Sequence, residues 1–230
     1  MKNIEINVTG ETKELIIREG TALPPVQPKA ISEIGSIESP SKFHAIRNGL
    51  PNKSIVVYSR NDKKIVFQAD PENPLAATIT GKLLLNKDLE KFNINAEKNW
   101  EVKELAKFFK MNKFFFDNKE INAKIVTALN NFKASVSTAM EQNQDNRGNM
   151  KDLIEKVVKS NVPEKFNLQM PIFIGYKEMK FPVEICFDTT DAGATCWLES
   201  PELNQLIISE RDRIIDEEIA KFKGLIIIEQ

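Results

Sequence analysis

The chain has 230 residues, of which 41% are hydrophobic and 28% are charged, as in an ordinary globular protein of one or two domains. No apolar run approaches the roughly 20 residues of a membrane helix, and the N-terminus lacks the apolar stretch of a signal peptide, so we expect a cytoplasmic protein with no membrane partner. Cys186 and Cys196 are the only cysteines, which excludes a disulfide framework and predicts two reduced thiols.

Charge is unevenly spread along the chain, although the net charge is only −1. Residues 53–165 carry 20 Lys and Arg against 15 Asp and Glu, whereas residues 166–230 carry 6 against 12. A mildly basic middle therefore precedes an acidic end. The asymmetry is far weaker than the basic face of a dedicated DNA-binding protein, whose domain pI is typically above about 9.

The first 30 residues are predicted to form an arm ahead of a main domain of residues 31–230. Residues 3–8 and 13–18 alternate around a Thr-Gly-Glu turn, which predicts a β-hairpin. Three prolines within residues 24–28 then favour an extended connector. A two-stranded ribbon is marginally stable alone, so the arm is expected to dock. Its own chain and another subunit are equally open as docking partners.

The next elements are a short helix and three strands. Ser39 and Pro40 predict the start of the helix, because Ser is a favoured N-cap and Pro fits the first helical position, and Gly49 is placed to end it. Three apolar β runs then predict an antiparallel meander, at residues 54–60, 64–70 and 75–85.

Helical periodicity dominates the middle of the chain. Residues 101–110 place apolar side chains on one side and lysines on the other. Residues 119–142 carry the most regular apolar stripe of the chain: Ile121, Ile125, Leu129, Phe132, Val136 and Met140. Residues 150–158 also fit a helix, but their β-branched valines leave a strand open.

The last third predicts strands at residues 166–174, 180–188 and 194–199, a helix at 201–223 and a closing apolar strand at 225–228. A turn around residues 191–193 would set Phe187 opposite Trp197 and put the two thiols diagonally on the other face. The Leu-Ile-Ile-Ile run of the closing strand is expected to be buried, either in this sheet or in that of a partner.

These elements predict an α+β fold. We expect a largely antiparallel sheet, with the long 119–142 helix and the C-terminal helix packed on one face, plus the N-terminal β-hairpin arm.

Residues that would support catalysis are scarce. His44 is the only histidine, which excludes histidine metal clusters and most nucleophile–histidine pairs, and no phosphate-binding glycine motif is present. Glu178 and Lys180 match the Glu-x-Lys part of a nuclease signature, but residues 166–176 lack the aspartate that it also needs. The sequence therefore predicts no catalytic residue, no metal site and no cofactor. A metal-dependent nuclease or hydrolase is the least favoured function.

The acidic residues of the last third have ordinary structural explanations. Aspartates beside a hairpin turn usually serve the turn, and carboxylates interspersed with arginine on a helix usually form a solvated face. The two groups are Asp188, Asp191, Glu199 and Glu202, and Asp212, Asp216, Glu217 and Glu218.

Two sets of residues are candidates for binding. Lysines alternate with phenylalanines in the region of residues 103–119, a combination that can track a phosphate backbone and stack bases, although core phenylalanines beside a wet lysine face would look the same. The nucleic-acid candidates are Lys103, Lys107, Lys110 and Lys113. The candidates for a protein interface are Phe114, Phe115, Leu225 and Ile227.

Residues 166–175 read Phe-Asn-Leu-Gln-Met-Pro-Ile-Phe-Ile-Gly. This segment resembles a strand of the form Phe-x-Leu-x-x-Pro-x-Phe-x-Gly in the YfdQ-like family of phage and prophage proteins, where a hairpin, a helix and a terminal apolar strand follow. A Pro-rich loop, a strand and a Phe-rich helix upstream are also similar, so the resemblance covers about residues 50–230. Residues 149–160 depart from the family, in which strands are expected there. The resemblance implies a phage-encoded accessory protein in the cytoplasm of an infected bacterium, and it carries over no catalytic residue.

The first functional hypothesis is therefore a non-enzymatic accessory protein that acts by binding or assembly. It would form a homo-oligomer and bind an unidentified host or phage protein. The alternative is a single-stranded nucleic-acid-binding protein of phage recombination, which would use the four lysines.

Overall fold

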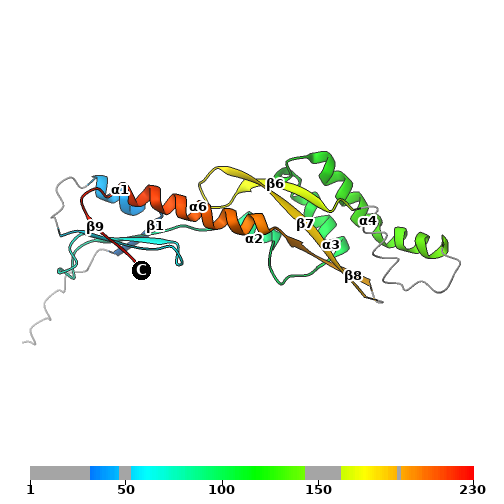
Figure 1. The fold of residues 1–230 in the computed structure, drawn as a ribbon, viewed down its shortest axis with the longest axis horizontal. Helices are drawn as coiled ribbons and strands as arrows, with labels where there is room; N and C mark the ends of the chain where they lie inside the picture. Colours follow the sequence, from blue (N-terminus) through cyan, green and yellow to red (C-terminus); the bar gives the residue numbers. More distant parts are fainter. Residues whose placement is uncertain (1–31, 47–52, 143–161, 191–192) are drawn as a thin grey trace, which may run out of the picture.

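The computed structural model describes residues 32–46, 53–142, 162–190 and 193–230. They form an elongated molecule with one β-sheet toward each end and helices packed against both (Figure 1). The predicted α+β class is confirmed. The strands divide between two sheets, however, where one was expected.

The five-stranded sheet has the order β1-β4-β3-β2-β9. Its strands are β1 (Ser32–Ser36), β2 (Ile55–Ser59), β3 (Lys64–Gln68), β4 (Thr78–Lys82) and β9 (Ile226–Glu229). The antiparallel meander of β2, β3 and β4 is as predicted. The two outer strands instead pair in parallel, β1 with β4 and β9 with β2.

Two helices cover one face of this sheet, α1 (Ser39–Ile46) and the C-terminal half of α6 (Pro201–Ile219) (Figure 1). The covered face carries Ile65 and Phe67, both fully buried. Phe43 of α1 and Phe222, which follows α6, contact the Phe67 ring with centroid distances of 5.9 and 6.1 Å. The covered face is therefore held by an aromatic cluster between the sheet and both helices.

Gly81 allows α1 to cross close above β4. A Cβ at this position would lie 2.7 Å from the Ile37 carbonyl oxygen and 2.7 Å from Cδ of Pro40. Real Cβ atoms do not approach backbone this closely, so any side chain here would push the start of α1 off the sheet.

The four-stranded sheet has the order β5-β8-β7-β6 and is antiparallel throughout. Its strands are β5 (Trp100–Glu101), β6 (Lys165–Pro171), β7 (Glu178–Thr190) and β8 (Gly193–Glu199). Alternation along β6 buries Phe166, Leu168 and Met170 on one face and leaves Lys165 and Gln169 exposed on the other.

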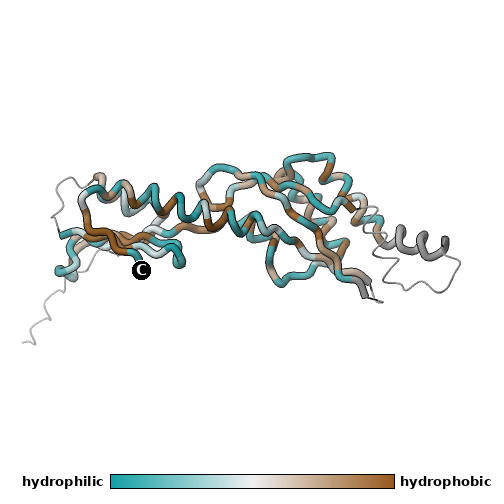
Figure 2. The backbone as a smooth tube through the Cα atoms, in the orientation of Figure 1, coloured by the Kyte–Doolittle hydropathy of each residue, from teal (hydrophilic) through white to brown (hydrophobic). Residues whose placement is uncertain are grey.

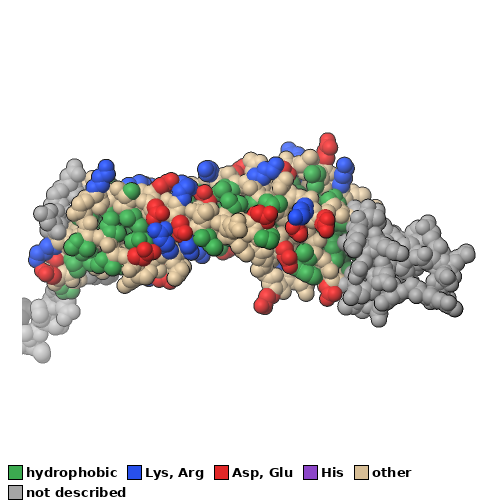
Figure 3. Space-filling view, in the orientation of Figure 1, with side chains coloured by type: hydrophobic (Ala, Val, Ile, Leu, Met, Phe, Trp, Pro, Cys, Tyr) green, Lys and Arg blue, Asp and Glu red, His purple; other side chains and the backbone are tan. Residues whose placement is uncertain are grey.

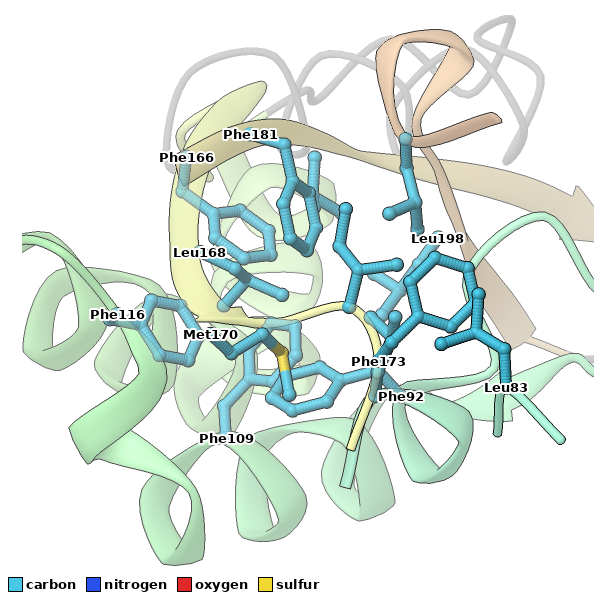
Figure 4. Close-up of a cluster of buried hydrophobic side chains, with 14 of the residues drawn as sticks. Leu83, Phe92, Phe109, Phe116, Phe166, Leu168, Met170, Phe173, Phe181 and Leu198 are labelled. Carbon is cyan, nitrogen blue, oxygen red and sulfur yellow. The ribbon is translucent and has the colours of Figure 1, made fainter. Parts of the chain in front are cut away.

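The helices behind this sheet are α2 (Lys87–Phe92), α3 (Val102–Met111) and α4 (Lys119–Gln142), with the short 3-10 helix η1 (Lys113–Phe115) between the last two. Phe92 and Phe109 project from the helices into a cluster with Phe166 and Met170 of the sheet (Figure 4). The Phe109 and Phe166 rings meet edge to face, with centroids 5.3 Å apart. Aromatic side chains thus hold the helices against the four-stranded sheet.

The long helix α4 begins directly after Asn118, whose Oδ1 accepts the N–H of Glu120 at 2.8 Å and caps the helix. It packs on α3: the buried side chain of Asn122, in α4, donates to the carbonyl of Phe109, in α3, at 3.1 Å. It also reaches the four-stranded sheet through Phe132, which stacks on Phe187 at 6.1 Å. The predicted helix over 119–142 is therefore confirmed.

Helix α6 joins the two ends of the molecule. With 19 residues it is about 28 Å long. Its N-cap Ser200 accepts the N–H of Leu203 at 3.1 Å and donates to the Pro182 carbonyl of β7 at 2.6 Å. Its other end buries Ile214 and Ile215 at the five-stranded sheet. The C-terminal helix therefore does not lie beside α4 on one sheet face, as expected, but spans from one sheet to the other.

A second connection joins the sheets through the backbone. The segment after β4 pairs with the segment after β6: the Asn86 N–H donates to the Ile172 carbonyl at 2.8 Å, and the Ile174 N–H donates to the Leu84 carbonyl at 3.0 Å. Buried hydrophobic residues form one continuous cluster across both ends. Within the described residues the two sheets thus share one continuous hydrophobic core.

Several sequence expectations are corrected. The hairpin register pairs Cys186 with Trp197 and Phe187 with Cys196, one residue away from the expected pairing, so the thiols lie on opposite faces. Strand β9 lies at a sheet edge with all four residues exposed in the single chain, so its own sheet does not bury it, and burial against a partner stays a prediction. β1, α2 and β5 were not predicted. The expected arm of residues 1–30 and the ambiguous segment 150–158 lie outside the described residues.

Candidate functional site

The four predicted lysines lie on the surface of α3 and η1. Lys103, Lys107 and Lys110 fall within about 60° of one another around the α3 axis, and Lys113 continues the line into η1. All four are exposed, and none forms a salt bridge with another described residue. The acidic Glu104 of the same helix lies about 100° from Lys103 and about 60° from Lys107 around the axis, at the border of the row of lysines. The structure therefore brings the four lysines together as one stripe.

The Phe-Phe-Phe segment after α3 goes from exposed to buried in three steps. Phe114 is 64% exposed, Phe115 is half-buried and Phe116 is buried. Phe114 lies against Phe115 with centroids 4.1 Å apart, and Phe115 meets fully buried Phe92 edge to face at 5.8 Å. The exposed ring is thus supported by a column of aromatics that reaches the core.

The exposed Phe114 and the four lysines together define the lysine ridge. Met111, 70% exposed, adds a further apolar side chain. Of the three phenylalanines, Phe114 is the one whose side chain is mostly exposed. Phe115, also predicted as an interface residue, instead supports Phe114 from below.

The other predicted interface residues lie at the opposite end of the molecule. Leu225 is half-buried and packs against the core, whereas Ile227 of β9 is 39% exposed. Its neighbours Ile226 and Ile228 are 62% and 43% exposed and point to the other side of the sheet. Figure 3 shows apolar side chains gathered at this end of the molecule.

Ile226 and Ile228 belong to a larger apolar surface that the sequence interpretation missed. The pairing registers place Ile34, Thr80, Val66, Val57 and Ile228 in one row across all five strands. Ile55 and Ile226 lie in the next row. These residues form the open face, on the side of the sheet away from α1 and α6. No described helix or strand covers it (Figures 1 and 2).

A cleft of about 610 Å³ lies beside the four-stranded sheet. Its walls include the carboxylates Glu97, Asp188 and Glu199 and the Trp197 ring, whose Nε1 donates to Glu199 at 2.6 Å. Asn95 also lines it, but both ends of its amide are bound, to the Ser200 backbone and to the Asn204 side chain. Asn95 therefore positions the cleft wall, and the exposed carboxylates show no ligand constellation of their own.

The acidic face of α6 was expected to be solvated, yet two of its carboxylates interact with an arginine of the five-stranded sheet. Arg60, at the end of β2, bonds Asp216 at 2.6 Å and Glu229 at 3.1 Å and lies 3.4 Å from Asp212. The bond with Asp216 raises the pKa of the Arg60 guanidinium further above neutrality. These carboxylates thus hold β2, β9 and α6 together.

The single histidine lies among aromatic rings. The His44 ring centroid is 5.6 Å from that of Phe67 and 5.5 Å from that of Phe222, and its buried Nδ1 has no hydrogen-bond partner among the described residues. The His44 ring therefore packs between these two aromatic side chains.

Neither thiol lies in an environment that favours a thiolate. Burial raises the pKa of Cys196 to about 12 and, with the carboxylate of Glu199, raises that of Cys186 to about 11. Both are therefore protonated near neutral pH.

An aspartate does lie beside the Glu-x-Lys pair of Glu178 and Lys180, but it does not come from the preceding strand. Lys180 bonds Asp117 at 2.7 Å, and Glu178 accepts from Gln169 at 3.1 Å. Asp117 precedes α4 and was not recognised because it lies far from β7 in the sequence. Within the described part of the chain, no group of three His, Cys, Asp or Glu residues could hold a metal ion.

Comparisons with known proteins add no relative. No family model matches the chain, and neither a curated protein nor a solved structure is similar to it. Among the described helices, none is long and apolar enough to cross a membrane.

Proposed function

We propose that the protein acts by binding and assembly, as a homo-oligomer in which a second copy covers the open face of the five-stranded sheet. The observation that carries this proposal is the apolar row from Ile34 to Ile228, which no described element covers. A contiguous apolar surface of this size usually marks an interaction site. Antiparallel and mixed sheets normally pack their apolar face against another layer.

A second copy suits this face because its two ends differ in charge that is not ion-paired among the described residues. Lys82 lies at one end and Asp70 at the other, whereas Lys64 pairs with Asp62 and Glu72 pairs with Lys53. Lys64 and Lys82 are register partners at one end of β3 and β4. The loop at the other end, between the same strands, carries Asp70 and Glu72. A two-fold, antiparallel arrangement of two copies would stack the apolar rows and set Lys82 of each copy over Asp70 of the other.

The area of the face predicts how strong the association is. Five strands of five residues, at spacings of about 4.8 Å between strands and 3.3 Å along them, cover about 400 Å². Two such faces bury about 800 Å² in total, below the roughly 1,200–2,000 Å² of a stable complex. We therefore expect a weak dimer whose population rises with concentration.

The test is the molar mass in solution, measured by light scattering from micromolar to sub-millimolar concentration. Wild-type protein should rise from the 26.1 kDa monomer toward twice that mass. The double variant Ile34→Lys/Ile228→Lys should remain monomeric, because two buried ammonium groups would face each other. The matched control is Ile208→Lys, an exposed isoleucine on α6 away from the face. A wild-type protein that stays monomeric throughout, or a double variant that still dimerises, would contradict the proposal.

The resemblance to YfdQ-like proteins suggests a setting for this assembly. On that basis the protein would be a phage-encoded accessory protein in the cytoplasm of an infected bacterium, where the oligomer binds a further host or phage protein. Affinity capture from infected cells, followed by mass spectrometry, tests this setting. Recovery of the protein from uninfected cells alone would contradict it.

A further inference from the structure

We propose that the lysine ridge is a binding site for single-stranded nucleic acid, in which the lysines contact successive phosphates and Phe114 stacks on a base. The ridge lies at the end of the molecule opposite the open face (Figure 1), so the inference does not depend on the proposed homo-oligomer.

The lysines have the arrangement that a phosphate backbone needs. Lys103, Lys107 and Lys110 follow one another at steps of four and three residues, about 6 and 4.5 Å along α3, and Lys113 follows beyond its end. These ammonium groups are exposed and form no ion pair with a described residue, so contact with phosphates breaks no ion pair among those residues. By contrast, many other described lysines, among them Lys64 and Lys180, already pair with a carboxylate.

Phe114 supplies the second element of single-strand binding. It is the only large aromatic side chain of the described residues that is mostly exposed. An exposed ring beside a row of positive charges favours an unpaired base, because every base offers a stacking face and the lysines hold the adjacent phosphates. The contacts with Phe115, and through it with Phe92, hold the ring in place before a ligand binds, which lowers the entropic cost of stacking.

A duplex suits the ridge less well. The ring of Phe114 would meet the edge of a stacked base pair or the sugar, where it gains little, and α3 exposes no arginine, asparagine or glutamine that would read base edges. The expected specificity is therefore for single strands with little preference for sequence.

The test is fluorescence anisotropy with labelled oligothymidine over a range of salt concentrations. Phe114→Ala should weaken binding about tenfold or more, whereas Phe114→Trp should retain it. Lys107→Ala/Lys110→Ala should lower the slope of log affinity against log salt by about 1.4, since each phosphate contact on a single strand contributes about 0.7.

The matched control is Lys177→Ala/Lys223→Ala, which removes two exposed lysines without salt bridges among the described residues. This pair should leave the salt slope unchanged. All substituted side chains are exposed, and circular dichroism verifies that each variant is folded. Absence of binding at low salt, an unchanged affinity in Phe114→Ala, or an equal loss in the control pair would overturn the proposal.

Discussion

The two sheets differ in how their faces are covered by the rest of the chain. The four-stranded sheet packs one face on an aromatic core and exposes polar side chains such as Lys180 and Glu184 on the other. The five-stranded sheet also has one face covered, by α1 and α6, but its second face carries a mostly apolar central row, interrupted by Thr80, that no described element covers. Described helices of the same chain therefore cover the apolar face of the four-stranded sheet, whereas no described element covers the second face of the five-stranded sheet.

This comparison separates stability from assembly. Side chains between the four-stranded sheet and its helices should determine whether the chain folds. Side chains on the open face should affect association far more than folding, because they remain partly in water in the monomer.

The largest effect is expected for Phe109→Ala. Phe109 is fully buried and contacts the rings of Phe92, Phe116 and Phe166, so its removal should cost about 3–5 kcal/mol of unfolding free energy. Val66→Ala on the open face should cost about 1 kcal/mol or less at monomer concentrations. Urea unfolding followed by circular dichroism measures both. Equal losses would show that the open face is as buried as the core.

A second expectation concerns the attachment of α1 to α6. Glu218 is only 4% exposed and accepts the Ser41 hydroxyl at 2.6 Å, with Lys221 as its other partner. Ser41→Ala removes one partner of a buried carboxylate and should cost about 1–3 kcal/mol in the same urea experiment. Ser209→Ala, an exposed serine of α6, is the control and should change the free energy little. A loss no larger than that of the control would mean that α1 is not held through Glu218.

A smaller effect is expected where α6 meets the four-stranded sheet. Ser200→Ala removes the N-cap of α6 and its bond to the Pro182 carbonyl, and should cost about 0.5–2 kcal/mol. The backbone bond from the Ser200 N–H to Asn95 remains, which limits the loss. Ser200→Thr retains a hydroxyl cap and should recover most of the stability. If both variants unfold alike, the cap does not stabilise this junction.

Local signals predicted most of the helices and strands. The stripe of α4, the Ser-Pro start of α6 and the β2–β3–β4 meander follow from periodicity and caps. The elements β1, α2 and the two-residue β5 could not be found this way. β1 has Ile34 as its one apolar residue, so only its parallel pairing with β4 makes it a strand. α2 has six residues, too few for a helical period, and its one signal was the Asn86 cap.

The division into two sheets depends on contacts between residues far apart in the sequence, which periodicity does not contain. The lysine ridge was predictable because a helix face follows from spacing alone. The open face was not recognised, although β2 carried a signal: Ile55, Val56 and Val57 are apolar in succession, and a strand that is apolar on both faces needs cover on both.

The smallest predicted effect concerns the two thiols of the four-stranded sheet. The register expected from the sequence placed both thiols on the same face of this sheet, which was wrong. Because Cys186 and Cys196 lie on opposite faces, mild oxidation should form no bond between them. Burial raises the pKa of Cys196 from about 9 to about 12. The folded state therefore favours the protonated thiol, and the contribution of this thiol to the unfolding free energy is fully present below about pH 8.5. That contribution is lost as the pH rises from about 9 to about 12, because the unfolded chain then loses the proton more readily than the folded one. By pH 9.5 the loss should be about 1 kcal/mol or less. Urea unfolding of wild type against Cys196→Ala isolates this term. Identical pH profiles would show that the face holding Cys196 admits water, and the contrast between the two sheets would then be weaker than their packing indicates.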